Sequence, residues 1–296
     1  MTRPNRIPVV LLALTCAVAL TPPAAAQVVY STAALDQLKS SLDDQARSVP
    51  DSVTGWHVDE NTNRVVVSVL DNTGARWAKS FGRGVRVERV RTAPRPLWNV
   101  IGGQAIYFSG GGRCSIGFNA RNAAGTRYLI TAGHCTEVVT NVSGTGGSVG
   151  PVAGSSFPGN DFGIIRVSSS AVSTPLVDRY SSGSDVTVAG STPVPVGGRI
   201  CRSGSTTGWR CGKVLGVNQT VNYGGGDVVT GLTRTNACAE PGDSGGSFVS
   251  DPGSGDRVQA QGLTSGGSGN CTSGGIVYFQ PIAEALSTYG LTLYTG

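Results

Sequence analysis

A serine set between glycines is the group in this chain that most resembles a nucleophile. Ser244 lies in the stretch Pro241–Gly246, with the sequence P-G-D-S-G-G. Neighbours without a Cβ leave its hydroxyl and backbone N–H free to meet another molecule. Gly242 can expose its N–H beside that of Ser244, and the two donors could stabilise an oxyanion. The same residue types also form ordinary turns, so Ser244 needs partners before it counts as a nucleophile.

A general base for Ser244 has few candidates, because the chain has only two histidines, His57 and His134. The stretch around Ser244 matches the G-x-S-x-G elbow of α/β-hydrolases, in which the histidine follows the serine. No histidine follows residue 134, which excludes that interpretation. The order His134, Asp161, Ser244 is the one that a trypsin-like triad requires.

In such a triad Ser244 attacks an acyl carbon, His134 acts as general base and Asp161 orients the imidazole. Asp243 is the competing candidate for the acid. His57 falls in a strand-like segment and is expected to be an exposed strand residue.

The elements that would hold these residues are short strands. His134 follows the apolar run 129–132 at a turn, and Asp161 precedes the apolar run 162–167. Similar runs, separated by Gly, Ser, Asn and Pro, recur from residue 100 to the C-terminus and indicate an all-β sandwich or barrel. The expected strands are 105–108, 114–118, 128–131, 162–167, 185–189, 196–200, 212–217, 228–235, 247–249, 259–263 and 276–280. Residues 281–290 predict a short helix, with Pro near its start and Gly at its end.

The first 99 residues differ from the rest in composition. Residues 1–26 have two arginines, an apolar run and a final Ala-Ala-Ala, which predicts a secretory signal peptide cleaved after Ala26. In the segment 27–99, apolar residues at helical spacing predict a helix over 32–47. Two apolar runs, 53–58 and 64–70, flank a polar turn and predict a β-hairpin. Prolines interrupt the stretch 94–99, which is predicted to be an extended linker.

Composition and charge narrow the function classes. Charged residues make up only 14% of the chain, which suits a compact extracellular β-protein. The formal charge of +5 comes mostly from the leader and from the segment before residue 100, and no basic stripe is visible, so we expect no nucleic-acid partner. The apolar run of the leader is too short for a good membrane span. We therefore expect no membrane partner, and we expect a monomer.

Cysteines point to an oxidising compartment. Of seven cysteines, Cys16 lies in the leader and six follow residue 113. An even number after a secretion signal predicts disulfides, in pairings that spacing alone cannot choose. The chain has neither a C-x-x-C pair nor a histidine cluster, so we expect no metal and no cofactor.

The three catalytic candidates occur in motifs that resemble the chymotrypsin superfamily of serine endopeptidases. The motifs are T-A-G-H-C at 131–135, N-D-F-G-I-I-R at 160–166 and P-G-D-S-G-G at 241–246. The segments 202–208, 221–227 and 262–271 resemble the bacterial streptogrisin and α-lytic protease branch. This resemblance implies two packed antiparallel β-barrels with a C-terminal helix, preceded by a small α/β pro-region. It implies a pro-region over 27–99 and a mature protease over 100–296, with cleavage within a few residues of Asn99–Val100.

The resemblance also assigns roles to residues around the triad. It pairs Cys114 with Cys135, Cys201 with Cys211 and Cys238 with Cys271. It gives Asp243 a structural ion pair with Arg202 rather than a part in catalysis. The implied walls of the specificity pocket are Ala239, Glu240, Pro241, Ser265, Gly266 and Gly267.

The function expected from these residues is that of a secreted serine endopeptidase acting on polypeptides. The glycine walls and the absence of an aspartate among residues 233–239 favour large apolar residues before the cut bond. In this branch, a specificity pocket that binds a glutamate side chain is expected to contain a histidine. The only histidine after residue 99 is His134, the expected general base. Two other classes stay open: a catalytically silent relative that acts as a binding module, and an esterase that uses the same triad.

Overall fold

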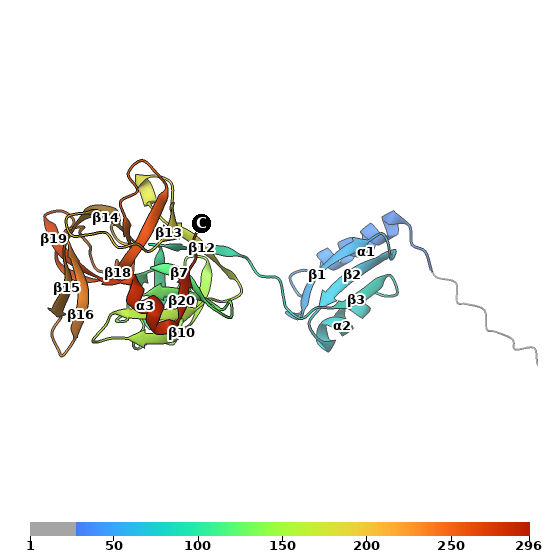
Figure 1. Ribbon diagram of the computed structural model, residues 1–296. Coiled ribbons are helices and arrows are strands. Elements are labelled where there is room, and N and C mark those ends of the chain that lie inside the picture. Colours follow the sequence, from blue (N-terminus) through green and yellow to red (C-terminus); the bar gives the residue numbers. More distant parts are fainter. Residues whose placement is uncertain (1–27) are drawn as a thin grey trace, which may run out of the picture. The chain divides into compact units, whose positions relative to one another are not determined.

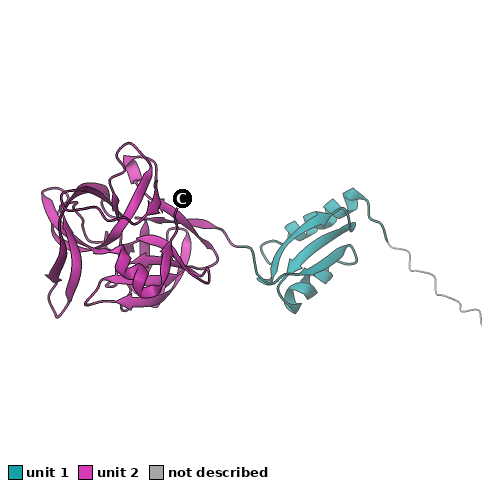
Figure 2. Cartoon of the chain, viewed as in Figure 1, with its two compact units in different colours: residues 1–94 teal, residues 95–296 magenta. Residues whose placement is uncertain are grey.

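The computed structural model describes residues 28–296. The expected signal peptide, 1–26, lies outside the described residues. The chain divides into two compact units, Met1–Pro94 and Arg95–Gly296 (Figure 2). No helix among the described residues is long and apolar enough to cross a membrane.

The described part of the first unit is a small α/β fold (Figure 1). Its elements in chain order are α1 Thr32–Asp43, β1 Val53–Asp59, β2 Arg64–Val69, α2 Asn72–Lys79 and β3 Val85–Arg89. The expected hairpin is present as the antiparallel pair β1–β2, and β3 adds in parallel on the other edge of β2. The core is made by Leu35 and Leu42 of α1, Val53 of β1, Val65, Val67 and Val69 of β2, and Ala78 of α2.

Two features of this unit differ from the sequence prediction. The first helix ends at Asp43 instead of residue 47. After it, the N–H groups of Gln45 and Ala46 donate to carbonyls three residues back, those of Leu42 and Asp43, so the chain continues as turns and not as α-helix. The helix α2 and the strand β3 were not predicted. The N-cap of α2 is Asp71, whose side chain accepts hydrogen bonds from the N–H groups of Thr73 and Gly74, the usual role of an aspartate at this position.

The second unit is almost entirely β-structure and carries one α-helix, α3 Ile282–Tyr289. Its strands up to residue 190 are β4 Trp98–Gly102, β5 Ala105–Phe108, β6 Arg113–Ser115, β7 Phe118–Asn122, β8 Arg127–Thr131, β9 Asn141–Gly144, β10 Gly147–Ser156, β11 Phe162–Arg166, β12 Ala171–Val177 and β13 Val186–Gly190. The later strands are β14 Arg199–Gly204, β15 Gly208–Asn222, β16 Val228–Thr235, β17 Ser247–Ser250, β18 Arg257–Asn270, β19 Gly274–Pro281 and β20 Leu291–Leu293.

The strands form two sheets, which confirms the chymotrypsin-like all-β fold. One sheet has the order β20-β7-β8-β11-β10-β9-β5-β6. The other has the order β17-β14-β15-β16-β19-β18-β13-β12-β4 and closes on itself, because β17 also pairs with β18. Most pairs are antiparallel, but β12–β4 and β13–β18 are parallel. Apolar side chains of both sheets, such as Ile130 and Phe162 from one and Val249 and Leu263 from the other, meet in a common core.

The helix α3 follows the prediction closely. It ends at Gly290, whose left-handed conformation (φ 60°) favours glycine. Ile282 is buried in the common core, and Leu286 and Tyr289 pack against it.

Six strands of the second unit have no counterpart in the prediction: β4, β7, β9, β10, β12 and β20. The expected strand 114–118 corresponds to β6 and shares only Phe118 with β7. In β10 the sequence G-S-V-G-P-V-A-G-S-S has little of the apolar alternation by which a strand is recognised. Its pairing partners β9 and β11 decide its conformation.

Candidate active site

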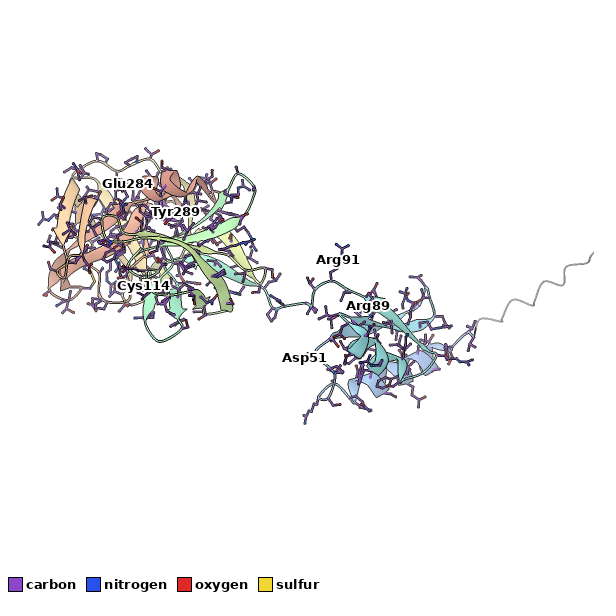
Figure 3. All side chains as sticks on the ribbon, turned by 90° about the horizontal axis from the view of Figure 1, so that it is seen from below. Asp51, Arg89, Arg91, Cys114, Glu284 and Tyr289 are labelled. Atoms are coloured by element: carbon purple, nitrogen blue, oxygen red, sulfur yellow. A yellow bond between two sulfur atoms is a disulfide. The ribbon has the colours of Figure 1, made fainter. Side chains whose placement is uncertain are left out.

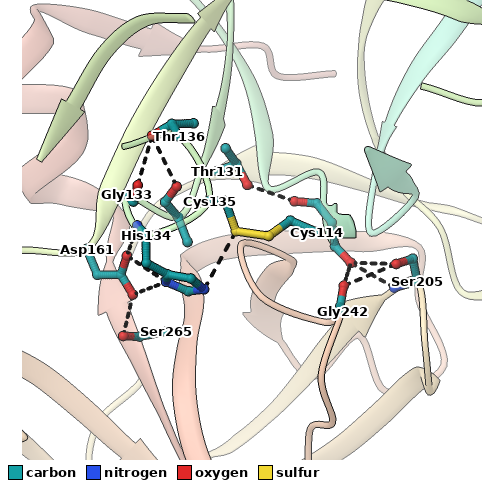
Figure 4. The surroundings of a disulfide bond; sticks show 12 residues. Cys114, Thr131, Gly133, His134, Cys135, Thr136, Asp161, Ser205, Gly242 and Ser265 are labelled. Atoms are coloured by element: carbon teal, nitrogen blue, oxygen red, sulfur yellow. Dashed lines mark hydrogen bonds and ion pairs between the residues drawn. A yellow bond between two sulfur atoms is a disulfide. The ribbon is translucent and has the colours of Figure 1, made fainter. Parts of the chain in front are cut away.

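His134 and Asp161 are brought together by two neighbouring strands. The strand β8 ends at Thr131, three residues before His134, and β11 begins directly after Asp161. The two strands are antiparallel with Thr131 opposite Gly163, so both residues lie at the same end of the pair. His134 Nδ1 lies 2.9 Å from Asp161 Oδ2 and 3.0 Å from Oδ1 (Figure 4).

The carboxylate of Asp161 is fully buried and held from several sides. Its Oδ1 accepts the backbone N–H of His134 at 3.0 Å, and its Oδ2 accepts the hydroxyl of Ser265 at 2.5 Å. The backbone N–H of Asp161 donates to the amide oxygen of Gln280, at 2.8 Å. Gln280 is itself fully buried, and its Nε2 donates to Glu284 Oε2 at 2.5 Å. These contacts fix both the position of the acid and the orientation of the imidazole.

The imidazole of His134 is partly open to solvent, with 29% of the side chain exposed. Burial lowers the pKa of His134, but the hydrogen bond to Asp161 and the charges of Asp161 and Glu137 raise it more, so the pKa lies above its ordinary value. Because Asp161 engages Nδ1, the tautomer with a proton on Nδ1 leaves Nε2 as the basic atom.

The loop that carries Ser244 lies against the strand that leads to His134. Gly245 has φ 77°, and a Cβ there would lie 2.0 Å from Thr131 Oγ1 and 2.8 Å from the backbone nitrogen of Ala132. The N–H of Ser115 donates to the carbonyl of Ser244 at 2.8 Å. In the described part of the chain no hydrogen bond joins Ser244 to His134, and His134 Nε2 faces Cys135 Sγ at 3.6 Å. Such contacts often tighten only when substrate binds.

Two N–H groups of the Ser244 loop are free to bind a ligand. The N–H of Asp243 donates to the carbonyl of Glu240 at 3.0 Å. On either side of it, the N–H groups of Gly242 and Ser244 have no acceptor among residues 28–296. Gly242 adopts φ 95°, and a Cβ at this position would lie 2.5 Å from Thr206 Oγ1. Only glycine therefore fits at this position without displacing its neighbours.

The carboxylate of Asp243 makes its hydrogen bonds and its ion pair with residues other than His134. Its carboxylate accepts the N–H groups of Glu240, Thr206 and Thr207. It also forms an ion pair with Arg202 at 3.3 Å, in which both side chains are completely buried. Arg202 Nε donates to the carbonyl of Cys238 at 2.9 Å. This arrangement leaves Asp161 as the acid that contacts His134.

Three disulfides lie near these loops: Cys114–Cys135, Cys201–Cys211 and Cys238–Cys271. They are the pairs that the family resemblance implies. The first ties the residue after His134 to β6, and the third joins the start of the Ser244 loop to the turn between β18 and β19. Cys114, Cys135 and His134 are close enough to hold a metal ion, but sulfurs joined in a disulfide are not the thiolate ligands that such a site needs.

A pocket of about 450 Å³ opens beside Ser244. Its lining comprises Ala239, Glu240, Pro241, Ser244, Thr264, Gly266, Gly267, Ser268 and Gly269. The carboxylate of Glu240 accepts the N–H of Cys271 at 3.0 Å. Ser265, expected in this wall, instead lines the neighbouring cavity with His134, and its hydroxyl binds Asp161.

Sequence reasoning missed two contributors to the site. The sequence gives no indication that Gln280 contributes to the site. Its neighbours in the chain only predict a strand, and its partner Asp161 is 119 residues away. Ser115 links the loops through its hydroxyl, which donates to the carbonyl of Gly242 at 2.8 Å. His57 lies on β1 in the first unit.

Comparison with known families accounts for both units. Residues 30–88 match the model of the alpha-lytic protease prodomain, and residues 107–288 match the trypsin model. Serine protease 2 of Streptomyces fradiae is 54% identical over 181 residues, which are 60% of this chain and 99% of that protein. Streptogrisin-C of Streptomyces griseus is 47% identical over 92% of this chain. The chain spans only 59% of streptogrisin-C and 65% of streptogrisin-D from the same organism.

Solved structures agree with these matches. The structure of Nocardiopsis protease is 50% identical, covers 67% of this chain and 100% of its own, and superposes with a TM-score of 0.61. A glutamic acid specific serine protease, described as using a histidine triad in substrate binding, is 44% identical. It covers 66% of this chain and 100% of its own, with a TM-score of 0.59.

Proposed function

Because this chain belongs to the streptogrisin and α-lytic protease family of trypsin-like serine proteases, we propose that it is a secreted endopeptidase that cuts polypeptides through Ser244, His134 and Asp161. The observation that carries this proposal is the buried carboxylate of Asp161 against His134 Nδ1, at the same end of the fold as the Ser244 loop. That loop presents two N–H groups without acceptors among the described residues.

The mechanism follows from these positions. Ser244 Oγ attacks the peptide carbonyl while His134 Nε2 takes its proton, and the N–H groups of Gly242 and Ser244 receive the oxyanion. His134 then protonates the leaving amine, which leaves an acyl group on Ser244. Water hydrolyses that acyl-enzyme by the reverse sequence. Asp161 holds the tautomer that makes Nε2 basic and stabilises the imidazolium.

The pocket beside Ser244 supports a preference for a large apolar residue before the cut bond. Three of its lining residues are glycines, which leave the slot open. Glu240 is the one charged residue of the lining, and its carboxylate already accepts the N–H of Cys271. A substrate glutamate would lack a cationic partner, because the lining of this pocket contains no Arg, Lys or His. The single histidine of the second unit, His134, lines the neighbouring cavity. A histidine triad like that described for the glutamate-specific relative cannot be built from one histidine.

The segments before the protease unit have separate roles in this proposal. Residues 1–26 direct secretion and are removed, as is common for a leader of this composition. The following segment, which the sequence places at 27–99, assists folding of the protease and then leaves by cleavage. The match of residues 30–88 to the alpha-lytic protease prodomain supports this role.

Labelling with a fluorophosphonate probe, read by mass spectrometry, tests the nucleophile. We expect the adduct on Ser244 and its loss in His134→Ala. An unlabelled but folded protein would favour a silent binding module instead. Mapping the cuts in denatured casein then separates a peptidase from an esterase. A majority of cuts after Lys, Arg or Glu would contradict the preference for apolar residues.

A further inference from the structure

One of the two N–H groups that receive the oxyanion belongs to the peptide unit between Pro241 and Gly242. In a trans peptide the N–H and the C=O point in opposite directions, so the direction of the Pro241 carbonyl decides where the Gly242 N–H points. In the described part of the chain this carbonyl accepts a single hydrogen bond, from Thr206 Oγ1 at 2.7 Å. That bond directs the Gly242 N–H away from Thr206, to a position where it has no acceptor among residues 28–296.

Gly242 does not fix the orientation of this peptide by itself. Its φ is 95°, and glycine adopts positive and negative φ about equally readily. A rotation of the Pro241–Gly242 peptide would exchange the directions of its N–H and its carbonyl. The oxyanion would then meet an acceptor instead of a donor, so a contact outside the peptide must select the orientation.

The peptide unit that follows is held at both ends. Its carbonyl, that of Gly242, accepts the hydroxyl of Ser205 at 3.2 Å (Figure 4). Its N–H, that of Asp243, donates to the carbonyl of Glu240 at 3.0 Å. The peptide before it is held only at its carbonyl end, because its N–H must stay free for the ligand. The hydrogen bond to the Pro241 carbonyl therefore selects the orientation of that peptide.

Thr206, the donor of this bond, lies in the turn between β14 and β15. Its backbone N–H donates to Asp243 Oδ1 at 2.9 Å, and Asp243 is completely buried. Its hydroxyl lies against the loop itself, since a Cβ on Gly242 would come within 2.5 Å of Thr206 Oγ1. The buried aspartate thus fixes the backbone of Thr206, but the direction of the hydroxyl proton depends on a further partner.

Arg113 is that partner. It begins β6, and the next residue of the strand, Cys114, is labelled in Figure 3. Arg113 Nη2 donates to Thr206 Oγ1 at 2.7 Å, and Nη1 donates to the carbonyl of Ser205 at 3.0 Å. A guanidinium has donors and no acceptor. The Thr206 hydroxyl must therefore accept from Arg113, which leaves its one proton for the carbonyl of Pro241.

We propose that Thr206 and Arg113 are positioning residues for the oxyanion-binding N–H of Gly242. Thr206 orients that N–H through the carbonyl of Pro241, and Arg113 orients the hydroxyl of Thr206. This inference rests on the proposed function, which gives the Gly242 N–H its role in acyl transfer. Loss of either side chain lets the peptide rotate in a fraction of the molecules. Those molecules bind substrate but stabilise the tetrahedral intermediate poorly.

The first test separates the hydroxyl of Thr206 from the rest of its side chain. Thr206→Val keeps the shape and removes the hydroxyl, whereas Thr206→Ser keeps the hydroxyl. Each variant is made as the full chain, matured with immobilised wild-type enzyme and assayed on a peptide amide that the wild type prefers. We expect Thr206→Val to lower kcat about three- to tenfold, the effect of losing one ordinary hydrogen bond, with KM within about twofold of wild type.

The serine variant decides whether the hydroxyl is responsible. Thr206→Ser should keep kcat within about twofold of wild type. An unchanged kcat in Thr206→Val, or an equal loss in both variants, would overturn the inference. Urea unfolding of the three proteins identifies any loss that comes from stability.

A peptide aldehyde measures the oxyanion-binding groups directly. It forms a tetrahedral adduct with Ser244, whose oxygen takes the place of the oxyanion. In Thr206→Val the affinity for the aldehyde should fall by the same factor as kcat. The matching peptide alcohol has no carbonyl, so its Kd should change by less than about twofold. Equal weakening of the two ligands would indicate a merely structural effect and would refute the positioning role.

The remaining variants test whether Arg113 acts through Thr206. Arg113→Met removes the guanidinium, and Arg166→Met is the matched control, because Arg166 is exposed at the end of β11 far from Asp161. We expect Arg113→Met to lower kcat about two- to fivefold, and Arg166→Met to leave it unchanged. Combined with Thr206→Val, Arg113→Met should cause no further loss. Additive losses, or an equal loss in Arg166→Met, would refute the link between Arg113 and Thr206.

These outcomes are separable from that of the proposed function. Wild-type enzyme that the fluorophosphonate probe does not label at Ser244 would refute the proposed function. Labelled and active wild-type enzyme, together with an unchanged kcat in Thr206→Val, would refute only the positioning role.

Discussion

Replacing Asp161 by asparagine tests the proposed triad most directly, because the contacts of Asp161 dictate how an amide must sit. Oδ1 accepts the backbone N–H of His134, so an NH₂ group there would meet another donor. The NH₂ group would therefore occupy the Oδ2 position, near His134 Nδ1 and the Ser265 hydroxyl. Nδ1 would then have to accept a hydrogen bond, which puts the imidazole proton on Nε2.

An imidazole with its proton on Nε2 cannot take the proton of Ser244. We expect Asp161→Asn to lower kcat by about 10⁴, the loss that the same change causes in trypsin, a member of the same superfamily. This loss corresponds to about 5 kcal/mol of transition-state stabilisation. Stability should change less, because the amide keeps the acceptor for the His134 N–H and Ser265 can reverse its hydrogen bond.

The assay is single-turnover hydrolysis of an apolar peptide ester or amide by protein whose pro-region has been removed with immobilised wild-type enzyme. Ser244→Ala prepared in the same way gives the background. Asp243→Asn is the matched control for the other buried aspartate of the site. Near-normal turnover in Asp161→Asn, together with a folded but inactive Asp243→Asn, would show that the acid has been assigned wrongly.

The remaining predictions concern pH, a supporting side chain, a disulfide and the pro-region. His134 must be neutral to act as base, and its pKa is held above the usual value of about 6.5. Activity should therefore rise with pH through a midpoint above that value. A pH profile of activity that is flat from about pH 5 to 8 would contradict the role of His134. Gln280→Leu leaves the buried N–H of Asp161 without an acceptor, so urea unfolding should show a loss of about 1–3 kcal/mol and kcat should fall. Glu284→Gln is the control, because it leaves the oxygen of Gln280 in place and its own amide oxygen can still accept from Gln280 Nε2, so it should retain more activity. Equal kcat in both variants would argue against a positioning role for Gln280. Removing the Cys238–Cys271 bridge by replacing both cysteines with serine opens a loop of 33 residues. The lost constraint on the unfolded chain should lower the free energy of unfolding by about 3–4 kcal/mol. An unchanged urea midpoint would refute this stabilising role of the disulfide. The protease unit folds through non-local strand pairs, which is intrinsically slow. Residues 95–296, the second unit, expressed under oxidising conditions should therefore gain activity when residues 27–94 are supplied as a separate chain. Equal yields of active enzyme with and without that chain would eliminate the folding role.

The sequence alone determined the chemistry and the class of fold. With only two histidines in the chain, the order of His134, Asp161 and Ser244 excluded the α/β-hydrolase interpretation before any geometry was known. Apolar runs of strand length with Gly and Pro between them predicted an all-β protein, and the pattern around residues 53–70 predicted the hairpin β1–β2. These features are local, because residue type and short-range spacing are sufficient to specify them.

Tertiary structure decided which distant groups meet. The acid beside His134 is Asp161 rather than Asp243 because β8 and β11 are neighbours, while Asp243 is held by Arg202. The contact of Gln280 with Asp161 spans 119 residues, and the strand β10, rich in glycine and serine, is extended only because β9 and β11 pair with it. The pairing of β4 with β12 shows that Trp98 is part of the protease unit, where the sequence reads as a linker. In each case the deciding interaction is a backbone or buried polar contact between segments far apart in the chain, and no local pattern of side chains encodes such a contact.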